Sequence, residues 1–130
     1  MIHKRRDRGA AAVEFALVLP ILVALLLGII EFGYAMYVQA AISGAAREGA
    51  RELAISSSTA SAQQAAANAA LPAVTLSASE IAANNSQCSA SPSAAVTVKI
   101  SYPYSGIAGL LPSGIKISGT GGACPGSRRT

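Results

Sequence analysis

Residues 9–31 of this chain read GAAAVEFALVLPILVALLLGIIE, and this stretch decides the kind of fold that the chain adopts. The run is apolar from Ala10 to Ile30 except for the carboxyl group of Glu14. A helix over these 21 positions would be roughly 31 Å long, which is close to the hydrocarbon thickness of a bilayer. The stretch therefore predicts a helix that crosses a membrane once, over about residues 10–31.

The charges on either side of this run predict its orientation. Four basic residues precede it, namely Lys4, Arg5, Arg6 and Arg8. Basic residues beside a membrane span stay in the cytoplasm. We therefore expect a cytoplasmic amino terminus in a bacterial inner membrane, and a carboxy-terminal region that is exported to the periplasm or the cell exterior.

Composition divides the chain into four zones. Residues 1–9 form a basic leader, and residues 10–55 are compatible with one long helix that contains Pro20. Residues 56–72 predict a short Ala-rich helix, which Thr59 or Ser61 would cap and Pro72 would end. Residues 73–130 form the exported remainder.

This last zone changes to the two-residue period of β-strands. Apolar side chains alternate over 74–76, 96–100 and 115–117, which predicts a small antiparallel sheet of about three strands. The Gly-rich tail from residue 119 to 130 is expected to fray. The fold class predicted is α+β, with the sheet packed against helix.

Composition also excludes several classes of function. With 130 residues the chain has room for one small domain, and its net charge of +4 comes largely from the two termini, so no basic face indicates a nucleic-acid partner. The only His is His3, in the leader, and the many Ser residues lie in low-complexity stretches. We therefore expect no enzyme activity, no cofactor and no metal site.

The junction of the leader and the apolar run carries the most informative chemistry. Gly9 leaves the backbone open to a peptidase, so we expect processing between Gly9 and Ala10. Glu14 follows five residues later, and a carboxylate inside a membrane helix is unfavourable unless it finds a partner. The new α-amino group of Ala10 could pair with the Glu14 of a neighbouring subunit during assembly. The alternative is a Glu14 side chain that reaches the lipid headgroups.

Glu31 allows two interpretations. It is either a second buried carboxyl group that pairs within an assembly or a residue at the outer membrane boundary. We favour the boundary, where water would reach Glu31 and where Tyr34 and Tyr37 fit the interfacial preference of aromatic side chains.

Further along the predicted helix, four charged residues share two faces. Arg47 and Arg51 are four positions apart, as are Glu48 and Glu52, so each like-charged pair is mildly unfavourable. Glu48 and Arg51 have the i, i+3 spacing that allows an ion pair. Opposite charges from another element could relieve both pairs, and a solvated helix surface is the alternative.

The two cysteines, Cys88 and Cys124, both lie in the zone assigned to the exterior, where disulfides persist. We predict that they form a disulfide, which would stabilise a small domain by about 3 to 4 kcal/mol. Two unpaired thiols are the alternative, because spacing does not establish connectivity.

Several segments together resemble one family. They are Gly9-Ala10-Ala11-Ala12-Val13-Glu14-Phe15, Ala16-Leu17-Val18-Leu19-Pro20, Ile30-Glu31-Phe32-Gly33 and Ala45-Ala46-Arg47-Glu48-Gly49-Ala50-Arg51. In this order and spacing they resemble the TadE-like family of tight-adherence pilus assembly proteins, over roughly residues 8–54.

The resemblance implies a minor pseudopilin of a tight-adherence, type IV-like pilus. Its implied partners are a prepilin peptidase, a major pilin and a companion minor pseudopilin, inner-membrane platform proteins with a secretion ATPase, and membrane lipid. Two other readings remain open. One is an uncleaved, membrane-anchored envelope scaffold or binding domain, and the other is a secreted protein with a removable signal peptide.

Overall fold

A computed structural model describes residues 6–84, 96–107, 109 and 114–124. Its elements are α1 (Arg6–Ser56), α2 (Thr59–Ala70), the 3₁₀ helix η1 (Ala78–Glu80), and strands β1 (Ile81–Asn84), β2 (Val96–Tyr104) and β3 (Ile115–Ala123). The strands form an antiparallel sheet in the order β1-β2-β3. The predicted α+β class, with a long N-terminal helix, a second helix and three strands, is confirmed.

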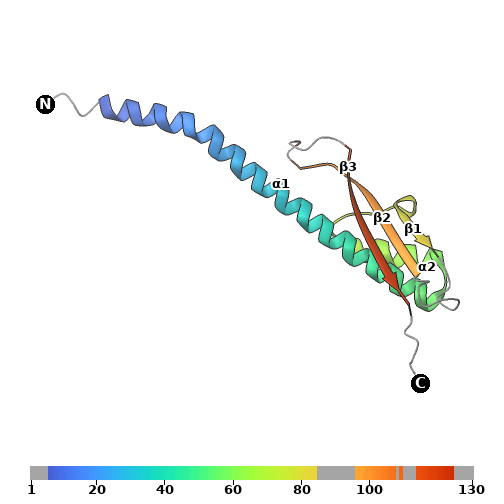
Figure 1. Cartoon of the computed structure of the whole chain (residues 1–130). Coiled ribbons are helices and arrows are strands. Elements are labelled where there is room, and N and C mark those ends of the chain that lie inside the picture. Colours follow the sequence, from blue (N-terminus) through green and yellow to red (C-terminus); the bar gives the residue numbers. More distant parts are fainter. Residues whose placement is uncertain (1–5, 85–95, 108, 110–113, 125–130) are drawn as a thin grey trace, which may run out of the picture.

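The long helix α1 has two halves with different surroundings. Figure 1 shows its N-terminal half projecting away from the rest of the molecule, while α2 and the sheet pack against its C-terminal half. The helix begins at Arg6, inside the expected leader, and continues through Pro20. It ends where Ser57 adopts a positive φ of 55°. One continuous helix therefore joins the exposed apolar run to the folded domain.

The hydrophobic core lies between the C-terminal half of α1, the helix α2 and the inner face of the sheet. Its largest fully buried side chains are Val38, Ile42, Leu53, Val98 and Ile100. Alanines supply much of the remainder, and they allow close contact between the helices. At Gly49 of α1, an added Cβ would lie 2.9 Å from the Cβ of Ala66 and 3.1 Å from the carbonyl oxygen of Ala62 in α2.

The N-cap of α2 differs from our expectation of Thr59 or Ser61. Ser58 occupies that position, and its side chain accepts a hydrogen bond from the Ser61 backbone amide. The expectation was wrong because three serines precede the helix and Thr59 begins it, and each of the four has suitable capping chemistry. The end of α1 at Ser56 selects among them.

The first strand does not lie where the alternation of Val74 and Leu76 predicted it. These two side chains are 5% and 7% exposed, but they belong to a loop, and β1 begins only at Ile81. An extended loop lying on a core buries every second side chain just as a strand does. The β1 segment pairs instead with β2, with Ile81 opposite Ile100.

The Gly-rich tail was predicted to fray from residue 119 onward. This prediction was wrong for residues up to Ala123, which belong to strand β3. Gly119 and Gly121 face α1, where an added Cβ at Gly119 would lie 2.9 Å from the carbonyl oxygen of Ile42, and one at Gly121 would overlap the backbone of Ala46. Two residues of a strand and four residues of a helix advance by similar distances, about 6.7 and 6 Å. The two glycines therefore allow the backbone of β3 to contact the backbone of α1 at two successive points, at Ile42 and at Ala46.

This contact makes a prediction about stability. We expect Gly121→Ala to lower the free energy of unfolding of the domain formed by α2, the sheet and the C-terminal half of α1 by about 1 to 3 kcal/mol or more, because the methyl group meets helix backbone that cannot move aside. Thermal unfolding of the full-length protein in detergent, monitored by limited proteolysis, would measure this loss of stability.

The neighbouring residue supplies the matched control. A Cβ at Gly122 would lie 3.8 Å from the carbonyl oxygen of Val96, which is an ordinary contact, so Gly122→Ala should change stability by less than about 0.5 kcal/mol. Equal effects of the two substitutions would contradict the close approach of β3 to α1.

Candidate assembly and processing surface on the N-terminal helix

The N-terminal half of α1 is exposed on all its faces. Every residue from 9 to 30 is classed as exposed, including the large apolar side chains. Among these are Val13, Phe15, Leu17, Ile21, Leu22, Leu25, Leu26 and Ile29, each more than half exposed. A helix that is apolar all round requires lipid or other helices as its surroundings. In length and composition, this helix is suited to crossing a membrane.

Glu14 lies within this exposed apolar surface. Ala11 and Val18, one turn to either side, share its face of the helix, and Phe15 is adjacent. Glu14 is exposed to the surroundings of the helix and is not buried in the folded domain of α2 and the sheet. A carboxyl group in this position is available to a group supplied by lipid, by water or by another subunit.

Gly9 and Ala10 lie in the first turns of α1, and both are exposed. Within the described part of the chain, no side chain or distant backbone lies within 4 Å of a Cβ added at Gly9. Because helix ends without tertiary packing open at low cost, this junction is accessible to a partner that needs an extended backbone.

Glu31 does not meet water as our preferred interpretation expected. Its side chain is only 3% exposed, so water does not reach it as it would at an open membrane boundary. The chain covers it with residues that follow β2, including Gly106. The expectation failed because it considered the helix alone, whereas the covering residues are about 75 positions away in the sequence. A role for Glu31 in assembly stays a prediction.

Tyr104, at the end of β2, is the second residue of this buried site. It is 4% exposed, and burial, followed by the negative charge of Glu31 and the proximity of the Tyr34 hydroxyl, raises the pKa of its hydroxyl. The Tyr34 ring lies 6.1 Å from the Tyr104 ring and 6.3 Å from the Tyr37 ring. Tyr34 thus joins the buried site to Tyr37, which is half exposed.

Sequence reasoning did not assign a role to Tyr104 or Gly106. The only available signal was the strand end at Tyr102-Pro103-Tyr104, followed closely by a glycine in a turn-rich stretch. Pairing a residue of the first helix with that turn requires the folded arrangement of β2 on α1.

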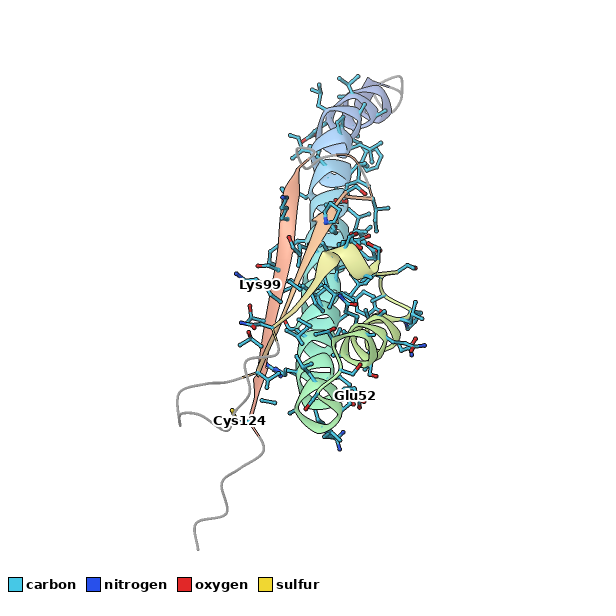
Figure 2. The ribbon with its side chains drawn as sticks, turned by 90° about the vertical axis from the view of Figure 1, so that its right-hand side faces the viewer. Glu52, Lys99 and Cys124 are labelled. Carbon is cyan, nitrogen blue, oxygen red and sulfur yellow. The ribbon has the colours of Figure 1, made fainter. Side chains whose placement is uncertain are left out.

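Of the charged residues on the C-terminal half of α1, Glu48 and Arg51 form the ion pair that their spacing allows, with 3.5 Å between Oε1 and a guanidinium nitrogen. Both side chains are at least half exposed, so the pair contributes little stability. Arg47 is exposed and Glu52 is half-buried. Figure 2 shows Glu52 near the C-terminal end of α1, away from Lys99 on the sheet. A role for this group in pairing with another element stays a prediction.

Cys124 follows β3 directly, whereas Cys88 lies outside the described residues. Asn84, Thr97 and Gly122 are successive partners across the sheet, so the chain leaves β1 and enters β2 at the end of the sheet that carries Cys124. Residue 88 is four positions beyond Asn84, which is compatible with the predicted disulfide. The pairing stays a prediction.

Comparison with known protein families finds a match for this helix. Residues 9–51 match the family model described as TadE-like protein. This segment is TadE-like. The match begins at Gly9 and contains Glu14, Glu31 and Arg51, but it spans only about one third of the chain. The helix α2 and the sheet lie outside it. No curated protein and no solved structure matches the chain.

The TadE-like segment supports a pilus-associated protein with an apolar N-terminal helix. The resemblance stated from the residues is therefore confirmed for α1. TadE-like proteins are pilus components and are not known as a family of enzymes.

Proposed function

We propose that this protein is a minor pseudopilin of a tight-adherence pilus, that a prepilin peptidase cuts it between Gly9 and Ala10, and that it assembles through α1. One observation carries the proposal: within a TadE-like segment, residues 9–30 expose an apolar surface on every side and this surface contains a single carboxyl group, Glu14. Such a helix can leave the lipid and pack against the helices of neighbouring subunits.

The proposed assembly contact joins two subunits. Cleavage creates an α-amino group on Ala10, one helical turn before Glu14. The ammonium group of one subunit pairs with the Glu14 carboxylate of the next, and their attraction is much stronger in an apolar environment than in water. Because leaving either charge alone in such an environment is costly, the pair sets the register between adjacent helices.

The proposed location follows from charge and hydropathy. The basic leader stays in the cytoplasm, α1 spans the inner membrane once, and the domain of α2 and the sheet is exported to the periplasm or the cell surface. The proposed partners are the peptidase, the major pilin, a companion minor pseudopilin, the inner-membrane platform with its ATPase, and lipid. The domain's contacts with them involve the part of the chain beyond the TadE-like segment.

The mass and amino-terminal sequence of the protein from its native host test this proposal. We expect a mature chain that starts at Ala10. A chain that keeps Met1 would instead identify an uncleaved envelope anchor, and a chain that starts beyond residue 30 would identify a secreted protein. Either result would refute processing at Gly9.

A further inference from the structure

Glu31 is the one charged residue among the buried side chains of the described chain, and the proposed function does not use it. It lies directly after the apolar run, where α1 leaves the membrane. An ionisable group at this depth is costly unless protein covers it and offers polar partners. Among the described residues, Tyr104 at the end of β2 and Gly106 shortly after it lie against Glu31.

Gly106 makes the closest approach to the carboxyl group. A Cβ added at Gly106 would overlap Oε1 of Glu31 and would lie 2.8 Å from Cδ. Gly106 does not have the positive φ that Gly109 and Gly114 adopt. Its lack of a side chain therefore matters because it leaves room for the Glu31 carboxyl group.

Tyr104 closes the site from the strand side. Its ring packs on Tyr34, one turn after Glu31 in α1, with 6.1 Å between centroids. Its hydroxyl oxygen is buried, and the neighbouring Glu31 carboxyl group adds to the effect of burial in raising the pKa of that hydroxyl. Glu31 thus meets Tyr104 and Gly106, which follow it by more than 70 positions in the sequence, at the membrane-proximal end of the sheet. Figure 1 shows that end, where β3 begins, beside the middle of α1.

We propose that Glu31, Tyr104 and Gly106 form a contact that fixes the orientation of the exported domain on α1, with Glu31 as the positioning residue. This group is called the Glu31 contact. The distal part of the sheet is held by Gly119 on Ile42 and Gly121 on Ala46. The Glu31 contact holds the proximal part and removes the carboxyl group from lipid. It acts within one subunit and does not depend on pilus assembly.

Hydrogen exchange measured by mass spectrometry on the full-length protein in detergent micelles tests the contact. Glu31→Ala should speed exchange of the amides at residues 101–107 about tenfold, because the strand end loses its buried partner. Amides of α2 and of α1 near Ala46 should keep their rates. Unchanged exchange at 101–107 would overturn the proposal and would leave Glu31 as an assembly contact.

A double-substitution cycle distinguishes a direct contact from general destabilisation. Gly106→Ala alone should also speed exchange at residues 101–107 about tenfold, since the methyl group displaces the carboxyl group. In the Glu31→Ala background the same methyl group has room, so Gly106→Ala should add less than about twofold. Effects that multiply would show that the two residues act separately and would overturn the proposal.

Two further variants keep the test decisive if Glu31→Ala fails to fold. Tyr104→Phe keeps the ring on Tyr34 and removes only the hydroxyl, so exchange at residues 101–107 should rise about threefold. Tyr37→Phe, on the half-exposed neighbour of Tyr34, is the matched control and should have no effect. Equal exchange in these two variants would contradict a role for the Tyr104 hydroxyl.

Discussion

Replacing Gly9 with valine should cause the uncut precursor to accumulate. Gly9 lies in the first turns of α1, with open space around its α-carbon in the described chain. A peptidase that acts at this bond must approach the backbone closely, and only glycine offers no side chain to obstruct it. The branched side chain of valine adds bulk at Cβ and stiffens the backbone.

Intact-mass measurement of membranes from the native host would quantify this effect. We expect the fraction of mature protein to fall at least about a hundredfold, which corresponds to about 3 kcal/mol in the barrier to cleavage. Gly28→Val is the matched control, because a Cβ there also meets open space in the described chain but lies within the span. Normal processing of Gly9→Val would count against cleavage after Gly9.

Replacing Glu14 with alanine should leave cleavage largely intact while pili are lost. Glu14 is exposed on an apolar helix and lies apart from the folded domain, so the subunit itself should remain stable. An ammonium group deprived of its partner in an apolar interface costs about 3 to 5 kcal/mol, which is enough to suppress assembly by more than about a hundredfold.

Two measurements in the same strain would check this prediction, namely the amino-terminal sequence of the subunit and electron microscopy of the cell surface. Glu48→Ala is a suitable control, since it also removes a carboxyl group from α1 but only from an exposed ion pair of little energetic weight. Normal pili with Glu14→Ala would refute the proposed pairing of Glu14 with the α-amino group of a neighbour.

Local patterns predicted the helical part of the molecule well. The apolar run after Gly9 and the Ala-rich stretch before Pro72 indicated α1 and α2, and the structure has helices there. Helices form through contacts between residues that are close in sequence, so composition and spacing are sufficient to predict them. The ion pair between Glu48 and Arg51 follows from the same local geometry.

The sheet was less predictable, because strand pairing depends on distant partners. The alternation at Val74 and Leu76 proved to be a buried loop, and the glycines from residue 119 onward proved to be a strand. A strand with so many glycines has poor intrinsic propensity. It forms here because β2 supplies its hydrogen bonds and because α1 lies so close that any larger residue at Gly121 would collide with it.

By itself, the sequence determined that this protein has an apolar helix preceded by a basic segment and carrying a carboxyl group at Glu14, because each of these features depends only on the order of residues along one segment. Only the tertiary structure decided the position of Glu31. Taken alone, the helix indicated a residue in contact with water, but the fold brings Tyr104 and Gly106 over it and buries it. That contact depends on a chain that returns to α1 after more than 70 residues, and no local pattern encodes such a return.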